Sequence, residues 1–353
     1  MLNYKIGRYP YIPILGVRNA EMRALEELPT EAKDTILPYI VLQRWASSSH
    51  FENTLSRLDA AINGRLAVVD ITRKPNPSGD KRKPVHDTID ELRNPANNFG
   101  SWYDFISDHD NFIPSLQIQD PSLIKPQVYK ILELDRGCVI RMPESIFSYA
   151  NYISTQISEV SQIAPFHFIL DYQHKRRDIL TQTASASEII RAIKQKLPFS
   201  TFSVAASTFP SSLVDVSNQD IYERQFHDQV AAQVGKDYLV YSDRASVRAE
   251  QGGGGGTPAP RIDYPLPEKW LFFRQPDFDE DEKQHAYKLA AQDAVNCEFW
   301  EDLNVWGTGQ IIDTANGTPA ITSPAASTAV RIHLHMYRQS QLSPGPIEKP
   351  WVD

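Results

Sequence analysis

The sequence predicts an α/β protein built as a (β/α)8 barrel of the TIM type, with a C-terminal hairpin and helical extension. Short runs rich in Ile, Val and Phe alternate with segments of helical periodicity over most of the chain. Eight such runs fall within roughly 250 residues, the usual size of a (β/α)8 barrel. Strand–helix alternation favours parallel strands with right-handed crossovers. An open doubly wound sheet is the alternative, because alternation alone does not show that a sheet closes.

The first four runs occupy residues 11–15, 37–42, 66–70 and 112–118. Behind the first run, Ala20, Leu25 and Leu28 mark one apolar face, which predicts a helix. Further helices are expected over residues 55–62, from residue 85 onward, and over 127–134. The third run is continuously apolar up to Asp70 and therefore predicts a strand buried on both faces.

The other four runs occupy residues 137–141, 166–171, 199–205 and 238–241. Helical spacing follows each of them except the last, over residues 146–160, 189–197 and 221–234. After residue 242 the alternation of apolar runs and helical segments ends. Residues 252–256 are five consecutive glycines, followed by a Thr-Pro-Ala-Pro stretch, which predicts a flexible loop.

The expected organisation is a barrel-like domain over residues 1–250, a flexible Gly/Pro-rich loop over 251–260, and an extension over 261–353 that packs on the barrel. Within the extension we expect paired strands at 261–264 and 270–274, a helix over 283–295 and a last helix over 327–337. His333 and His335 lie two apart in that last helix, so their side chains turn away from each other and form no metal pair.

Composition limits the function classes. The chain of 353 residues has a formal net charge of -8, which argues against non-specific binding to nucleic acid or anionic membranes, although a local basic site remains open. Two cysteines, Cys138 and Cys297, are too few for a disulfide framework or a four-thiolate zinc site. With no apolar run near ~20 residues and no signal-peptide pattern, we expect a cytoplasmic protein without membrane attachment.

Candidate catalytic residues follow from position, because barrel enzymes place their chemistry at the carboxyl ends of the strands. Asp70, Asp171 and Asp243 end the third, sixth and eighth predicted strands. Together they could act as general bases or hold Mg²⁺, which prefers oxygen ligands. Alternatively, they pair with Arg141 and Arg244 in a buried network that only closes the barrel, with no metal or other cofactor.

Basic side chains gather in loops at the same end. Arg73, Lys74 and residues 81–83 crowd the loop after the third strand, and residues 174–177 the loop after the sixth. A cationic rim would attract an anionic ligand such as a nucleotide, a nucleic-acid backbone or an acidic protein surface. The candidates for binding such a ligand are Arg141, Arg244, Lys175 and Arg176. The alternative is that both loops are simply solvated and bind no ligand.

The opening stretch has a proline-containing strand over 11–15, then Arg18, Glu21 and Leu28, then a second Leu-Pro strand over 36–40. In these features it resembles the phage beta-protein family. Residues 241–247 resemble the family's Gly-Asp-Tyr-type turn, with Ser242 in place of the usual glycine and Arg244 where an aromatic residue is common. The Tyr…Trp…Phe-Arg hairpin of the family has its counterparts in Tyr264, Trp270, Phe273 and Arg274.

This resemblance implies a biological setting more than a reaction. The namesake of the family is encoded in satellite and temperate phages beside a killer protein whose toxicity it suppresses, and such loci protect the host against other phages. Relatives occur in bacterial genomes near defence genes. The resemblance supplies no catalytic residues. Our first hypothesis is therefore a phage-encoded or bacterial anti-phage defence component that controls a toxic effector by binding a protein partner. The partner would come from the same defence locus or be a phage protein. Aromatic side chains of the extension would anchor that partner: Trp270, Phe272, Trp300 and Trp306.

The second hypothesis is a barrel enzyme or nucleotide sensor with an acidic, metal-dependent mouth. Asp70, Asp171 and Asp243 would then do metal or general-base work, and Arg141 and Arg244 would hold a phosphate. Only the analogy with other barrel proteins, which are usually enzymes, supports this second hypothesis. A non-catalytic binding protein is the preferred interpretation.

Overall fold

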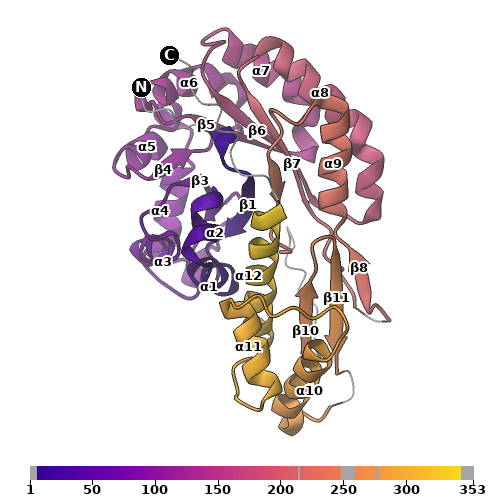
Figure 1. The fold of residues 1–353 in the computed structure, drawn as a ribbon. Coiled ribbons are helices and arrows are strands. Elements are labelled where there is room, and N and C mark those ends of the chain that lie inside the picture. Colours follow the sequence, from indigo (N-terminus) through magenta and orange to yellow (C-terminus); the bar gives the residue numbers. More distant parts are fainter. Residues whose placement is uncertain (1–5, 214, 248–258, 276–277, 343–353) are drawn as a thin grey trace.

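The computed structural model describes residues 6–213, 215–247, 259–275 and 278–342. All eight predicted strands of the barrel-like region form, and they pair in parallel. One sheet has the order β4-β3-β2-β1-β9 and the other the order β5-β6-β7 (Figure 1). The strands are β1 (Tyr11–Gly16), β2 (Tyr39–Leu42), β3 (Ala67–Ile71), β4 (Phe112–Pro114), β5 (Cys138–Pro143), β6 (Phe166–His174), β7 (Thr201–Ser207) and β9 (Tyr241–Asp243). The predicted α/β class is confirmed.

Isolated parallel bridges join the two sheets at both ends. Ser115 pairs with Val139 beside β4 and β5, and Phe202 pairs with Leu239 beside β7 and β9. Backbone hydrogen bonds extend the second junction, because the Arg244 amide donates to the Ala206 carbonyl at 2.9 Å. These contacts place β4 next to β5 and β7 next to β9.

Side chains alternate between two apolar clusters on opposite faces of the strands, as a period of two requires. The larger cluster lies between the strands and the helices. The smaller one, here called the inner cluster, receives a side chain from every one of the eight strands or the residue just before it. Its members include Ile12, Tyr39, Val68, Ile113, Val139, Ile169, Ala205 and Val240.

Helices pack outside the strands (Figure 1). Those of the strand–helix region are α1 (Asn19–Glu26), α2 (Thr30–Thr35), α3 (Glu52–Ile62), α4 (Pro84–Leu92), α5 (Ala96–Ser107), α6 (Ile124–Leu134), α7 (Ala150–Ser158), α8 (Thr183–Lys196) and α9 (Tyr222–Val234). Short 3-10 helices add η1 (Ile6–Arg8), η2 (Gly79–Lys81), η3 (Pro121–Leu123), η4 (Glu144–Tyr149), η5 (Arg177–Gln182) and η6 (Glu280–Glu282). Helices α2 and α5 had not been predicted. Within the described ranges, no helix has both the length and the apolar character needed to cross a membrane.

The extension forms the predicted hairpin, with β10 (Arg261–Pro265) antiparallel to β11 (Lys269–Arg274). A third strand, β8 (Asn218–Asp220), pairs with β11 and comes from the connection between β7 and α9. Helix α10 (Lys283–Val295) has the predicted bounds, α11 (Trp306–Ala315) is unpredicted, and α12 (Pro324–Leu342) is longer at both ends than predicted. The five glycines lie outside the described residues.

Helix α12 is buried on most of its surface and joins the extension to the strand–helix region. It contacts α1 and β1 on one side and β10 and α11 on the other, and Figure 1 shows it running up to β1. Ile332 and Met336 enter the larger core, whereas Val330 and Leu334 enter the core of the extension. The division at residues 251–260 stays a prediction.

Buried neutral histidines predict acid sensitivity. Burial lowers the pKa of His167 to about 3, that of His227 to about 3 and that of His333 to about 4. Their unfolded pKa is about 6.5, so below that pH the unfolded chain binds protons that the folded chain does not. As the pH is lowered from about 6.5 to about 4, the free energy of unfolding therefore decreases, by up to about 1.4 kcal/mol per pH unit for each histidine.

Urea unfolding between pH 4.5 and 7.5 measures this slope. We expect His167→Gln to reduce it by about one proton, because Gln does not titrate and can still bond Thr201 and Ser203, the partners of the imidazole. The exposed His50 gives the control variant His50→Gln. An unchanged slope in His167→Gln would contradict the burial of a neutral imidazole at this position.

Candidate functional site

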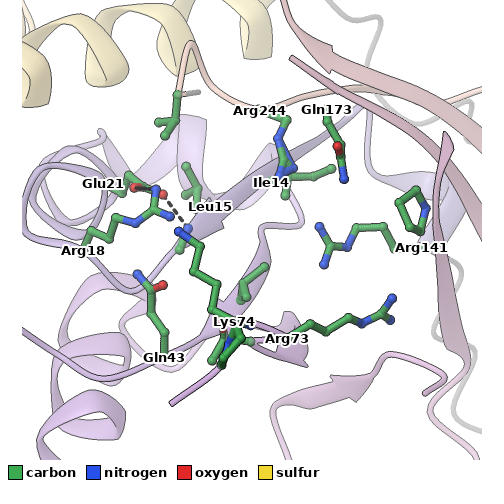
Figure 2. A pocket seen from close by; sticks show the side chains of 16 residues that line it. Ile14, Leu15, Arg18, Glu21, Gln43, Arg73, Lys74, Arg141, Gln173 and Arg244 are labelled. Carbon is green, nitrogen blue, oxygen red and sulfur yellow. Dashed lines mark hydrogen bonds and ion pairs between the residues drawn. The ribbon is translucent and has the colours of Figure 1, made fainter. Parts of the chain in front are cut away.

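A pocket of about 370 Å³ opens at the carboxyl ends of the parallel strands. Its walls come from residues that end or directly follow different strands. Gly16 ends β1, Arg73 follows β3, Gln173 lies near the end of β6 and Arg244 follows β9. The sequence places these residues far apart, and the parallel arrangement brings them together (Figure 2).

Cationic side chains dominate the lining of the pocket: Arg18, Arg73, Lys74, Arg141 and Arg244. Figure 2 shows Lys74 extending toward Arg18 and Glu21, while Arg73 lies on the side of Arg141. Three carboxylates oppose these five cations, namely Glu21 in the wall and Asp70 and Asp171 beneath it. The site therefore has an excess of two positive charges, in a protein whose net charge is -8.

Arg141 bridges the two buried aspartates. Its Nη2 lies 3.0 Å from Asp70 Oδ2 and its Nη1 lies 3.2 Å from Asp171 Oδ2. Burial raises the pKa of Asp70, but the charges of Arg73 and Arg141, together with hydrogen bonds from Gln117 and Tyr39, hold that pKa below its usual value. Gln117 and Tyr39 also donate to Asp70, at 3.1 Å and 2.8 Å. Asp70 is thus an ionised group whose oxygens are already occupied.

Arg244 and Arg73 complete the cationic side of the pocket. Arg244 Nη1 lies 3.1 Å from Asp171 Oδ2, and burial lowers the pKa of its guanidinium. For Arg73, neither Nε nor Nη2 has a hydrogen-bond partner among the described residues, although both atoms are buried. A buried donor without a partner is costly, so Arg73 is prepared to donate to an incoming acceptor.

Glu21 closes the other side of the pocket. Its carboxylate accepts from the backbone N–H of Gly16 and from Arg18 Nη1, the latter at 2.9 Å. Burial raises the pKa of Glu21, and Arg18 opposes that shift. A Cβ at position 16 would lie 3.2 Å from the Gln43 amide nitrogen, so glycine lets the strand end approach both side chains closely.

The sequence profile of the Beta protein family matches residues 11–341. The chain belongs to this family. It is also 29% identical over 348 residues to Protein beta of Enterobacteria phage P4, covering 95% of this chain and 94% of that protein. No solved structure matches the chain significantly.

In this beta protein, two of the stretches that suggested the family meet at the pocket. The opening stretch supplies Gly16, Arg18 and Glu21, and the turn over 241–247 supplies Arg244. Arg244, where the resemblance led us to expect an aromatic residue, therefore lines the pocket. Arg18, Glu21 and Arg244 belong both to the stretches that suggested the family and to the pocket lining.

The three predicted aspartates do not share one site. Asp70 and Asp171 lie under the pocket, but Asp243 faces the opposite side of the strands, where it accepts from Tyr11 at 2.6 Å and Tyr241 at 2.8 Å. His335 of α12 lies 2.7 Å from its Oδ2. Across the described ranges, no group of three His, Cys, Asp or Glu side chains is placed to hold a metal ion. Asp70 and Asp171 pair with arginines of the pocket, as the alternative of a buried Asp–Arg network predicted. The expected place of Asp243 beside them is wrong.

Of the four predicted anion-binding residues, Arg141 and Arg244 line the pocket, whereas Lys175 and Arg176 do not. Lys175 Nζ instead pairs with Glu144 at 2.8 Å, and Arg176 is exposed on the loop that follows β6. Arg18, Arg73 and Lys74, which were not among those four candidates, line the pocket in place of Lys175 and Arg176. Their positions directly after β1 and β3 are the signal that identifies them.

Of the four predicted partner-binding aromatics, two are buried and two are half-buried. Trp270 is 0% exposed and stacks on His335, with ring centroids 5.0 Å apart, and Phe272 contacts the Phe209 ring. These two cannot act as exposed anchors. Trp300 and Trp306 are half-buried, against Tyr264 and His333 respectively.

Proposed function

We propose that the eight parallel strands close into one (β/α)8 barrel and that its pocket binds a phosphate-bearing small molecule. The bridges at both junctions of the two sheets support closure. So does the inner cluster, because a side chain from each strand fills one common interior, as in a barrel of this type. The pocket then occupies the end of the barrel where ligands bind.

The excess of positive charge carries the proposal of a phosphate ligand. A phosphate group brings one to two negative charges and several acceptor oxygens, which guanidinium groups bind in pairs. Arg73 Nε and Nη2 supply two buried donors that have no described partner. Because the carboxylates of the site are held by arginine or backbone groups, we propose ligand binding, not turnover, as the role of the pocket.

Calorimetric titration with pyrophosphate tests the proposal. We expect binding that weakens with salt, and a loss of about tenfold or more in Arg73→Ala, because a hydrogen bond to a charged group contributes about 1.5–3 kcal/mol. Arg176→Ala removes an equal charge from the same protein outside the pocket and serves as the control. Pyrophosphate that fails to bind, or that binds Arg73→Ala as tightly as the parent, would refute the assignment.

We also propose that this beta protein controls a toxic effector by binding a protein encoded beside it in the phage. With Trp270 and Phe272 buried, the candidate anchors are the exposed tyrosines: Tyr129 on α6 and Tyr149 and Tyr152 near the start of α7, at 58%, 52% and 44% exposure. Tyrosine is among the residues that dominate binding energies at protein interfaces. Tyr129 and Tyr152 both lie near Lys125, so they belong to one surface.

Affinity purification from cells carrying the native locus, with and without phage infection, tests this second proposal. We expect the neighbouring protein to co-purify in stoichiometric amount and to be lost from the double variant Tyr129→Ser, Tyr152→Ser. Phe299→Ser changes an aromatic residue of similar exposure, 51%, in the extension and is the control. A beta protein that purifies alone under both conditions would contradict the proposal.

A further inference from the structure

The pocket continues into a second cavity of about 410 Å³. The two share part of their walls, including Arg18, Gln43, Thr72 and Lys74. Each volume lies within the usual range of about 300–1,000 Å³ for small-molecule sites. The phosphate pocket is therefore one half of a longer cleft, and a ligand bound there has room to extend toward α4.

The second cavity has a different chemistry from the first. Its cations are shared with the phosphate pocket except for Arg44, whose guanidinium is held by the Ser48 and Ser47 carbonyls at 2.7 Å and 2.6 Å. Apolar side chains stand beside amides there. The wall includes Val17, Asn19, Ala46, Asn76, His86 and Ile89.

This combination fits a flat polar ring. Arg44 and His86 are planar groups on which a base can stack, and arginine planes and imidazole rings are common stacking partners for bases. The Asn19 amide offers both donors and an acceptor for the edge of a base. Asn76 offers only its Oδ1 acceptor, because its Nδ2 already donates to the His86 carbonyl and to Asp90. A phosphate pocket joined to an amide-lined, partly apolar cavity therefore combines recognition of both parts of a nucleotide.

We propose that the ligand is a nucleoside phosphate, with its phosphates beside Arg73, Arg141 and Arg244 and its nucleoside in the second cavity. This inference rests on the proposed phosphate-binding function and specifies the class of ligand. Nothing in it requires a chemical step. The boundary between the two halves lies at Arg18, Gln43 and Lys74, which line both cavities.

Titration of the full chain with matched probes tests the inference. The probes are pyrophosphate, ribose 5-phosphate and the four ribonucleoside diphosphates. We expect at least one diphosphate to bind tenfold or more tightly than pyrophosphate and ribose 5-phosphate. Asn19 is exposed at the start of α1 and lines only the second cavity, so Asn19→Trp should remove that gain while pyrophosphate binding stays unchanged. Asn316→Trp, at an exposed residue after α11, is the control for the added indole.

Each other outcome has a defined meaning. If pyrophosphate binds and no nucleoside diphosphate binds more tightly, the nucleotide inference fails and the phosphate proposal stands. Ribose 5-phosphate that equals the best nucleotide also overturns the inference, in favour of a sugar phosphate. A nucleotide gain that survives Asn19→Trp overturns the assignment of the second cavity. If no probe binds, both proposals fail together.

Discussion

Asp243→Ala should lower the free energy of unfolding by about 3–5 kcal/mol, the usual loss when one partner of a buried charged network is removed. The carboxylate is 0% exposed and accepts from the hydroxyls of Tyr11 and Tyr241 and from the backbone N–H of Ala245. His335 joins it from α12. Alanine would leave all these groups buried without their acceptor, and each unsatisfied group costs about 1–3 kcal/mol.

Urea unfolding at pH 7 measures this loss. Asp243→Asn keeps the shape and one acceptor oxygen, so it should fall between Asp243→Ala and the parent. Asp237→Ala, at an exposed residue on the same segment of chain, should leave the free energy of unfolding unchanged. If Asp243→Ala unfolds like the parent but loses ligand binding, Asp243 has a chemical role and the structural one described here is wrong.

Arg141→Met should lower stability by a similar amount, about 3–5 kcal/mol, because it leaves buried carboxylates without their shared cation. Asp70 and Asp171 are 0% and 1% exposed with the guanidinium in place, so its removal leaves both charges in a largely buried setting. Arg244 still contacts Asp171, so that carboxylate keeps an ion pair. Asp70 loses its ion pair with Arg141, and the destabilisation therefore arises mainly at Asp70. Arg141→Met should also weaken pyrophosphate binding, since the side chain lines the pocket.

A double-mutant cycle with Asp70→Asn separates the ion pair from general damage. The double variant Asp70→Asn, Arg141→Met should be more stable than the sum of the single losses predicts, because neutralising the carboxylate removes the unpaired charge. Arg176→Met is the control for loss of an exposed arginine. Strict additivity of the two losses would show that Arg141 does not stabilise Asp70.

The strand–helix pattern could be predicted because each parallel strand contains or directly follows a short apolar run, as β9 follows Leu239 and Val240. All eight predicted strands formed at or near their expected positions. Strand β8 could not be read, since its sequence, Asn-Gln-Asp, is polar and only pairing with β11 makes it a strand. Helix α11 contains Gly307 and Gly309, which weaken helical propensity, and its burial against α10 and α12 overrides that weakness.

For the site, the sequence predicted which residues end the strands. It did not predict which face of the strands their side chains point to. Asp70 and Asp171 lie in phase with the inner cluster, whereas Asp243 lies in phase with Tyr241 and therefore points to the other side. One residue of offset reverses the face of a strand side chain. The burial of Trp270 depends on Phe209 and His335, which are distant in sequence, so composition alone could not reveal it.

Helix α12 also sets the order in which this chain can mature during synthesis. The first helix of the region, α1, packs against residues that are made about 300 positions later. At the usual rate of about 5–20 residues per second, α1 and β1 wait roughly 15–60 s for that partner. Until then, α1 has only its earlier partners, among them β1 and α3, and the part of its surface that packs on α12 stays uncovered.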